Sequence, residues 1–228
     1  MPIELVVFDI SGTTVGNGCE VGKAIAAAFS GFGYEIPEAG INRLMGYEKR
    51  YMIGQLLKNC RHCPDTKAEL VAGIYKRFIE EITRYYREAS LEMLPNVERT
   101  FVALKNSGIK VGIDTGFSKD IAGIIAERLK WKMNRLIDVM VAADEVALGR
   151  PYPYMIERMR GMLAIHDPAS VAKVGDTEAD IREGQNAGCG FVIGITTGVY
   201  TKPQLEQFRP THIVDDIADI LPIVCSKD

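Results

Sequence analysis

The chain has 228 residues, of which 47% are hydrophobic and 25% are charged. This composition is that of an ordinary globular protein and excludes a disordered or fibrous chain, while the length allows one domain or two small ones. With 27 basic against 30 acidic residues the net charge is −3, so we expect no nucleic-acid partner and no membrane partner.

The N-terminal segment, MPIELVVFD, carries acidic residues and no basic ones, which argues against a signal peptide. No apolar run approaches the roughly 18–20 residues that cross a bilayer. The five cysteines are odd in number and widely scattered, as expected of reduced thiols rather than of a disulfide framework. We therefore expect a cytoplasmic protein.

Short apolar runs rich in β-branched residues alternate along the chain with helical patterns. Near-continuous apolar runs of this length suit strands that are buried on both faces of a parallel sheet. The runs occupy residues 3–8, 109–113, 136–141, 171–174 and 191–195, with a weaker one at 212–214. The alternation predicts an α/β protein with a doubly wound, mostly parallel, Rossmann-like sheet.

One stretch, from about Val21 to Tyr86, breaks the alternation because it has helical periodicity and no convincing strand. Glycines precede this stretch, and Met93-Leu94-Pro95 follows it. We interpret it as an all-helical cap domain that two linkers connect to the α/β core. The expected cap spans residues 16–91, and the expected core spans residues 1–15 and 92–228.

Polar residues and glycines follow four of the predicted strands at the point where each strand ends. Because the active site of an open α/β sheet lies at the carboxyl ends of its strands, these residues are candidates for one site. They are Asp9, Ser11, Gly12 and Thr13 after the first strand, Asp114, Thr115 and Gly116 after the second, Gly149, Arg150 and Pro151 after the third, and Asp176 and Asp180 after the fourth.

These residue types suit phosphoryl chemistry. Asp9 and Asp176 supply the hard carboxylate oxygens that Mg²⁺ prefers, and a carboxylate can also be the nucleophile. Backbone N–H groups, a hydroxyl and a guanidinium can bind a phosphoryl group. The residues that offer these donors are Gly12, Thr13, Thr115, Gly116 and Arg150. Taken singly, an Asp at a strand end is often a turn residue and a Thr there often caps the next helix.

Four segments resemble the motifs of the haloacid dehalogenase superfamily. VVFDISGTT is similar to its first motif, IDTG to its second, the Arg150-Pro151 segment to its third and VGDTEAD to its fourth. The resemblance implies that Asp9 is the nucleophile and that Thr115, Gly116 and Arg150 bind the phosphoryl group. It also implies a Mg²⁺ ion held by Asp9, the Ser11 carbonyl and Asp176, with Asp180 in support.

Ser11 departs from the superfamily pattern. Phosphatases and mutases of the superfamily carry a second Asp at this position, which serves as acid and base. A serine hydroxyl does not titrate near neutral pH and cannot fill that role. A sugar mutase or a fast phosphomonoesterase is therefore disfavoured: either the leaving group needs no acid from residue 11, or the enzyme is slow.

The chain also resembles the phosphonoacetaldehyde hydrolases, or phosphonatases, of that superfamily. These enzymes place a small residue at this position and form a Schiff base between a cap lysine and the substrate aldehyde. The resemblance lies in DISGTTV, GRPYP and KVGDTEADIREGQNAG. The spacing of MGYEK implies that Lys49 is the Schiff-base lysine. Two positions differ, because Met52 and Phe117 stand where phosphonatases carry His and Tyr.

Three roles for Lys49 stay open on the sequence alone: Schiff-base formation, electrostatic binding of the substrate phosphate, and a solvated surface charge. Schiff-base formation needs a largely neutral amine, and therefore burial or a cationic neighbour such as Arg50. The favoured hypothesis is a Mg²⁺-dependent, phosphonatase-like hydrolase that acts on a small phosphorylated or phosphonate substrate through Asp9. The alternatives are a weak phosphomonoester phosphatase of the same superfamily and a non-catalytic phosphate-binding or regulatory protein.

Two further features lie in the expected cap. Cys60-Arg61-His62-Cys63 lacks the second ligand pair of a structural zinc site, so we expect a loop between two cap helices. An aromatic cluster is expected in the cap core or at the surface of a homodimer formed through the cap. Its members are Tyr75, Phe78, Tyr85 and Tyr86.

Overall fold

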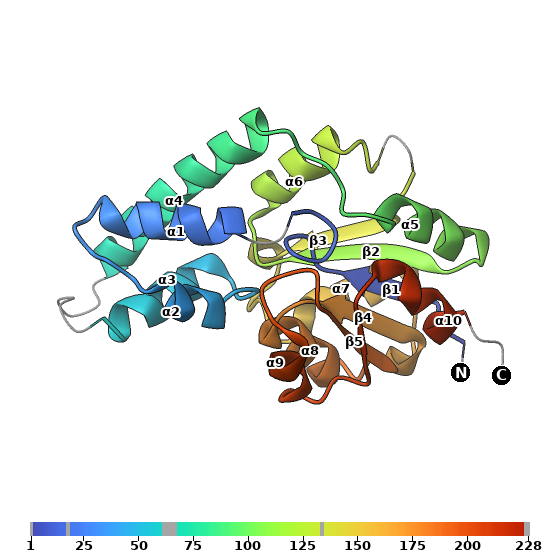
Figure 1. Ribbon diagram of the computed structural model, residues 1–228. Coiled ribbons are helices and arrows are strands. Elements are labelled where there is room, and N and C mark those ends of the chain that lie inside the picture. Colours follow the sequence, from blue (N-terminus) through green and yellow to red (C-terminus); the bar gives the residue numbers. More distant parts are fainter. Residues whose placement is uncertain (1, 17–18, 61–67, 133–134, 226–228) are drawn as a thin grey trace.

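The computed structural model describes residues 2–16, 19–60, 68–132 and 135–225 (Figure 1). Its centre is a six-stranded sheet in the order β3-β2-β1-β4-β5-β6, in which all neighbouring strands are parallel. The strands are β1 (Leu5–Phe8), β2 (Lys110–Thr115), β3 (Val139–Ala142), β4 (Val171–Gly175), β5 (Phe191–Ile195) and β6 (His212–Val214). The predicted fold class is confirmed. Strand β3 starts later than expected, because the Asp138 carboxylate before it accepts the Val111 N–H at 2.9 Å.

Helices cover both faces of the sheet, which explains why β1 and β4 are buried along their whole length. In Figure 1, α5 (Val97–Asn106) and α6 (Lys119–Arg128) lie above the sheet, and α7 (Tyr154–Leu163) and α8 (Glu178–Asn186) lie below it. The shorter helices are α9 (Lys202–Glu206), α10 (Leu221–Val224), η1 (Ala143–Glu145), η2 (Pro168–Ser170) and η3 (Ile217–Ile220). Connections from the adjacent strands β1 and β4 run in opposite directions, so a crevice opens at their carboxyl ends.

Between β1 and α5 the chain forms four helices, and the described residues 19–60 and 68–88 contain no strand. These helices are α1 (Cys19–Ser30), α2 (Glu38–Arg43), α3 (Lys49–Lys58) and α4 (Ala68–Glu88). They lie to the left of the sheet in Figure 1, beyond the carboxyl ends of the strands. Apolar side chains such as Phe29 and Phe78 are fully buried among them. We refer to these helices as the cap; the division into domains at residues 16 and 91 stays a prediction.

The two linkers between the cap and the sheet lie side by side. Val15 forms an isolated antiparallel bridge with Met93. The Leu94 N–H donates to the Thr14 carbonyl at 2.9 Å. The chain therefore leaves and re-enters the core at one place, next to the carboxyl end of β1.

The cysteines and the aromatic residues of the cap differ in how well they match the predictions. Cys189 and Cys225 are free thiols, but Cys60 is disulfide-bonded, so the expectation of reduced thiols is wrong there. The predicted loop around Cys63 lies outside the described residues. Phe78 and Tyr86 are buried and Tyr85 is 40% exposed, while the homodimer stays a prediction. Among the described helices, none has the length and apolarity needed to cross a membrane.

Candidate active site

A cavity of about 20 Å³ lies between the carboxyl ends of β1, β2 and β4 and the start of α3. Seven of the ten predicted site residues line it: Asp9, Ser11, Lys49, Thr115, Gly116, Arg150 and Asp176. The other three, Gly12, Thr13 and Asp180, are buried behind its wall. The topology thus brings together residues that are up to 167 positions apart, because parallel strands end at one edge of the sheet.

Asp9 stands where the buried strand β1 ends. Its N–H still donates to the Val174 carbonyl of β4 at 3.1 Å, which fixes the backbone. Its Oδ1 accepts a hydrogen bond from Arg150 Nη1 at 2.7 Å. Burial raises the pKa of Asp9 to about 6, although the Arg150 charge opposes the shift. The carboxylate, which is the nucleophilic form, therefore predominates above about pH 6.

Arg150 is surrounded by carboxylates. Its Nε donates to Glu183 Oε2 at 2.9 Å, its Nη1 to Asp9, and its Nη2 to Asp114. Nη1 also reaches the carbonyl of Gly46 in the cap at 3.4 Å. All three guanidinium nitrogens are engaged, so in this structure Arg150 positions Asp9 and compensates its charge. Direct binding of a phosphoryl group by Arg150 stays a prediction.

A second buried cation, Lys173 on β4, was missed by the sequence analysis. Its Nζ donates to Asp114 and lies 3.1 Å from Asp180 and 3.5 Å from Glu183. Burial opposes its charge, but these carboxylates outweigh it and raise the pKa of Lys173. Burial and repulsion by Asp114 raise the pKa of Glu183 well above its usual range, which favours its neutral form. The available signal was a lysine within the otherwise apolar run 171–174, which requires a buried counter-charge.

Three buried carboxylates form a candidate metal site. Oxygens of Asp9, Asp176 and Asp180 all lie within 4.8 Å of one another. Burial and repulsion from Asp180 and Asp9 raise the pKa of Asp176 well above its usual range. A hard divalent cation would relieve this repulsion, and oxygen ligands of this kind suit Mg²⁺. Asp180 is partly committed elsewhere, since its Oδ2 accepts the Thr177 N–H at 3.2 Å, which agrees with a supporting role.

Gly12 and Thr13 support Asp176 rather than offering N–H groups to an anion. The Gly12 N–H donates to the Val15 carbonyl at 3.0 Å and the Thr13 N–H to the Ile10 carbonyl at 3.4 Å. This differs from the prediction, because the turn after β1 uses these donors itself. The Thr13 hydroxyl instead donates to Asp176 Oδ1 at 3.2 Å. Gly12 has φ +89°, and a Cβ there would lie 2.5 Å from Asp176 Oδ2, so glycine is required.

Thr115 and Gly116 line the cavity at the end of β2. The Thr115 hydroxyl accepts the Phe117 N–H at 3.1 Å, so it also stabilises the turn. A Cβ on Gly116 would lie 2.6 Å from the Tyr47 carbonyl and 2.7 Å from the Gly46 carbonyl. The cap loop therefore rests directly on this glycine, and the cap is closed over the site.

Lys49 is the first residue of α3. Glu48 begins this helix by accepting the N–H groups of Arg50 and Tyr51 with its carboxylate. Lys49 is only 5% exposed, which rules out the solvated surface charge. Its Nζ donates to the Tyr47 carbonyl at 2.9 Å and lies 5.3 Å from the centre of the Phe117 ring. Burial lowers the pKa of Lys49 to about 8, although the Asp9 charge opposes the shift.

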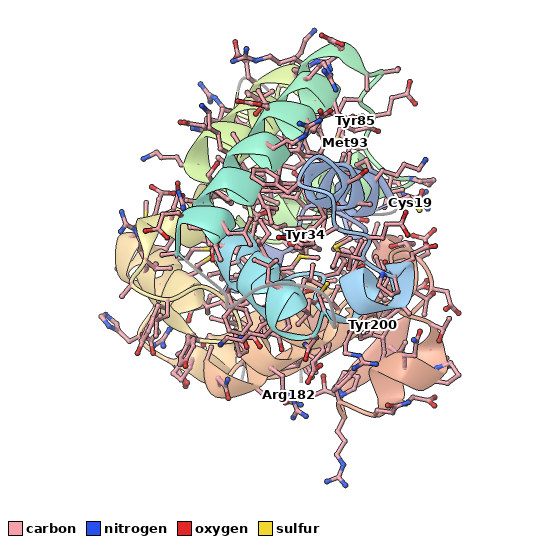
Figure 2. All side chains as sticks on the ribbon, turned by 90° about the vertical axis from the view of Figure 1, so that its left-hand side faces the viewer. Cys19, Tyr34, Tyr85, Met93, Arg182 and Tyr200 are labelled. Carbon is pink, nitrogen blue, oxygen red and sulfur yellow. The ribbon has the colours of Figure 1, made fainter. Side chains whose placement is uncertain are left out.

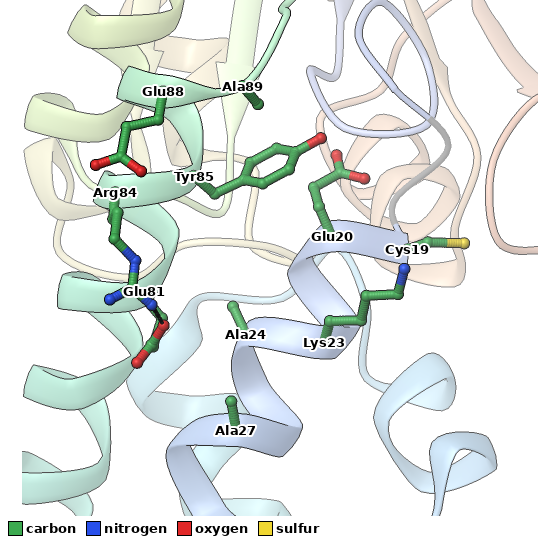
Figure 3. A pocket seen from close by; sticks show the side chains of 10 residues that line it. All are labelled: Cys19, Glu20, Lys23, Ala24, Ala27, Glu81, Arg84, Tyr85, Glu88 and Ala89. Atoms are coloured by element: carbon green, nitrogen blue, oxygen red, sulfur yellow. Dashed lines mark hydrogen bonds and ion pairs between the residues drawn. The ribbon is translucent and has the colours of Figure 1, made fainter.

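Ser11, which replaces the acid of related phosphatases, is linked to a cap carboxylate. Its hydroxyl donates to Glu20 Oε1 at 3.3 Å, and the Tyr86 hydroxyl donates to the same oxygen at 3.3 Å. Figure 3 shows Glu20 at the start of α1, across from α4. The Tyr86 ring meets the Phe117 ring edge-on at 5.6 Å. Glu20 was not predicted at the site, and Tyr86 was predicted only as a cap aromatic, because their contact joins residues 66 positions apart.

The model of the haloacid dehalogenase-like hydrolases matches residues 6–193 of the chain. The chain belongs to this family. It is 29% identical to the phosphonoacetaldehyde hydrolase of Bacteroides fragilis, over 96% of this chain and 87% of that one. It is 30% identical to the phosphonoacetaldehyde hydrolase of Bacillus cereus, over 95% of this chain and 86% of that one.

Solved structures share the fold of this haloacid dehalogenase-like hydrolase. A phosphonoacetaldehyde hydrolase-like protein from Oleispira antarctica has a TM-score of 0.83 at 24% identity, covering 98% of this chain and 92% of that one. A predicted phosphoglycolate phosphatase from Haemophilus somnus has a TM-score of 0.80 at 21% identity, covering 97% of both chains. The expectation of a hydrolase of this superfamily is confirmed.

We expect Mg²⁺ to raise the melting temperature of this haloacid dehalogenase-like hydrolase. At 100 times its dissociation constant, a ligand that binds only the folded state stabilises it by about 2.7 kcal/mol. The variant Asp176→Asn should lose most of this Mg²⁺-dependent shift, and it should melt higher than the unmodified protein without Mg²⁺, because the repulsion among the three carboxylates is reduced. Thermal denaturation with and without MgCl₂, at constant ionic strength, measures both effects.

The exposed Asp120 in the first turn of α6 provides the matched control. The variant Asp120→Asn should keep the full Mg²⁺-dependent shift. An equal shift in Asp176→Asn and in the unmodified protein would contradict the metal site.

Proposed function

We propose that this hydrolase uses Mg²⁺ to transfer the phosphoryl group of a small carbonyl-bearing phosphonate to Asp9 and then to water. The observation that carries the proposal is the buried amine of Lys49, which lines the same cavity as Asp9 and has a pKa lowered to about 8. An amine of this kind is partly neutral at physiological pH and can attack a carbonyl carbon. The names of the phosphonoacetaldehyde hydrolase relatives support this substrate class.

The chemistry follows from the two nucleophiles in the cavity. The Lys49 amine adds to the substrate carbonyl, and loss of water gives a protonated imine. The Asp9 carboxylate attacks phosphorus, and the electron pair of the P–C bond moves into the imine to give an enamine. Water then cleaves the aspartyl phosphate to phosphate, and the enamine is protonated and hydrolysed to release the carbonyl product and Lys49. Mg²⁺ would offset the charge of the phosphoryl oxygens.

This route explains why a serine suffices at residue 11. The leaving group is an enamine carbon whose electron pair is delocalised onto nitrogen, and no alkoxide needs a proton. The Ser11 hydroxyl, which donates to Glu20, would then have no acid role in P–C cleavage.

A phosphomonoester phosphatase is the second candidate, and one observation favours it. Met52 is fully buried on α3, where phosphonatases have a histidine, so this position offers no side chain that carries protons to and from the imine. In this case Lys49 would bind the phosphoryl group by charge alone, and Asp9 would still accept it.

Borohydride trapping with phosphonoacetaldehyde separates the two candidates. We expect a covalent adduct on the peptide that contains Lys49, found by mass spectrometry, because borohydride reduces the imine. The yield should rise with pH through about 8, as the pKa of Lys49 implies, and Asp9→Asn should increase it by stalling the reaction after imine formation. The control Lys49→Arg keeps the charge and should give no adduct. If neither the unmodified protein nor Asp9→Asn gives an adduct, the imine route is contradicted and the phosphomonoester phosphatase is favoured.

A further inference from the structure

A cleft of about 430 Å³ lies beside the catalytic cavity, between the cap and the core. Its cap side is formed by α1, by α2 and by the segment before α2, and its core side by Gly198 and Val199 in the loop after β5. The next residue, Tyr200, donates its hydroxyl to the Arg43 carbonyl at the end of α2 at 3.0 Å, and so holds the two sides together. Figure 2, which looks onto the cap, shows Cys19 and Tyr200 on this flank.

Only a thin wall separates this cleft from the catalytic cavity. Val199 lines both spaces. Met45 lines the cavity, and a Cβ placed on Gly22, which lines the cleft, would lie 3.6 Å from the Met45 Cε. Because methionine is unbranched and flexible, a rotation of the Met45 side chain would be enough to open a passage between the two spaces.

The two spaces differ in size and character. The catalytic cavity, about 20 Å³, has room for roughly one water molecule, and its floor carries the charges of Asp9, Arg150 and Asp176. In the proposed function the phosphoryl group lies beside Asp9 and the carbonyl carbon beside Lys49, and both residues line this cavity. The cavity has no room for further carbon atoms, so the rest of the skeleton must extend through its wall.

The lining of the cleft suits an apolar group. Ala26, Ile36 and Ile41 contribute aliphatic carbon to it. Asn42 adds one half-buried polar side chain, and Lys23 and Glu38 are solvent-exposed and lie at its rim. Small-molecule sites have this arrangement, in which apolar walls bind the body of the ligand and a few polar groups surround the entrance.

We propose that this cleft holds the carbon skeleton of the substrate, and that the substrate carries an alkyl or aryl group larger than the two carbons of phosphonoacetaldehyde. The inference rests on the proposed function, because it takes the phosphoryl group to bind beside Asp9. It makes Met45, Gly22 and Val199 the residues that decide how long a substrate the enzyme accepts.

Alkylphosphonates test the cleft without turnover, because their P–C bond has no adjacent carbonyl. Methyl-, butyl- and hexylphosphonate are titrated into the protein with Mg²⁺ and followed by calorimetry. Each methylene that enters an apolar site should tighten binding by about two- to fourfold. We expect hexylphosphonate to bind at least about tenfold more tightly than methylphosphonate.

Filling the cleft should remove this gain. The variant Ala26→Leu places a larger side chain in the cleft, and Gly22→Leu does so from a position with ordinary room for a Cβ. In each folded variant, hexylphosphonate should bind within about threefold of methylphosphonate. The matched control is Ala27→Leu, because Ala27 does not line the cleft and lines instead the neighbouring groove between α1 and α4 (Figure 3). The Ala27→Leu variant should keep the full increase in affinity from methylphosphonate to hexylphosphonate.

The outcomes separate this inference from the proposed function. If methylphosphonate binds but longer chains bring no gain, or if the gain survives in both filled variants, the cleft is not the substrate site. If no phosphonate binds, methylphosphonate included, the phosphoryl site itself is wrong and both proposals are overturned.

Discussion

Replacing Asp9 by asparagine should abolish turnover. The carboxamide of Asp9→Asn keeps the size of the side chain and one oxygen acceptor for Arg150, but its neutral oxygen does not attack phosphorus. We expect kcat to fall by at least about a thousandfold, as for other variants that lose a nucleophile. Steady-state kinetics with phosphonoacetaldehyde and with a panel of phosphomonoesters would measure the loss.

The same variant distinguishes chemistry from folding. The circular dichroism spectrum of Asp9→Asn should match that of the unmodified protein, because the hydrogen bond to Arg150 is kept. Its melting temperature without Mg²⁺ should be no lower, because the repulsion with Asp176 and Asp180 is reduced. Asp120→Asn, on the exposed face of α6, should keep full activity. Wild-type turnover in a folded Asp9→Asn protein would show that another group attacks phosphorus.

Removing the buried ammonium group of Lys173 should destabilise the fold more than any surface substitution. In Lys173→Met, the carboxylates of Asp114 and Asp180 lose one of the two cations that compensate them, with only Arg150 left. Breaking a buried ion pair in this way costs about 3–5 kcal/mol of unfolding free energy. Urea denaturation at pH 7 measures the loss.

A matched lysine on the surface controls for the loss of charge. Lys105 lies 2.8 Å from Asp138 with 28% of its side chain exposed, so Lys105→Met should cost no more than about 1 kcal/mol. A loss of similar size in both variants would contradict the role assigned to Lys173.

The difference in unfolding free energy between Lys173→Met and the unmodified protein should become smaller as the pH falls. Burial would raise the pKa of Asp114, but Arg150 and Lys173 outweigh it and hold this pKa below its usual value. The stability that Asp114 contributes is therefore present at neutral pH and lost as the pH falls through its folded-state pKa. Without Lys173 the pKa of Asp114 is higher, so Asp114 contributes less stability to the variant, and acidification removes less of it. A gap that widens toward pH 4 would contradict this account.

Much of the fold was predictable because its signals are local. The apolar runs that form β1, β2 and β4 predict strands buried on both faces, and the helical spacing of residues 21–86 predicts the helices of the cap. The polar residues at the strand ends also converge without knowledge of the packing, since parallel strands end at one edge. Asp9 and Asp176 are such residues.

The parts that escaped prediction depend on contacts across the chain. Lys49 was a predicted site residue, but its burial was not predictable, because Glu48 and Arg50 beside it also suit a surface charge and its contact with Phe117 is distant in sequence. The turn after β1 uses the N–H groups of Gly12 and Thr13, which residue type alone does not reveal. The buried charges behind Arg150 likewise join α8, β2 and β4, whose residues are far apart in sequence.

The pairing of Val15 with Met93 places both linkers of the cap at one point, which could serve as a hinge. Two segments that are paired side by side at one point would oppose translation of the cap, and would leave it mainly a rotation about that point. Such a rotation would separate the Gly46 carbonyl from Arg150 and would move Lys49 away from Asp9 at the same time. In the proposed mechanism, an open cap would therefore separate the Lys49 amine from the Asp9 carboxylate. The same closing movement of the cap would then enclose the substrate, bring Lys49 close to Asp9 and exclude water from the site.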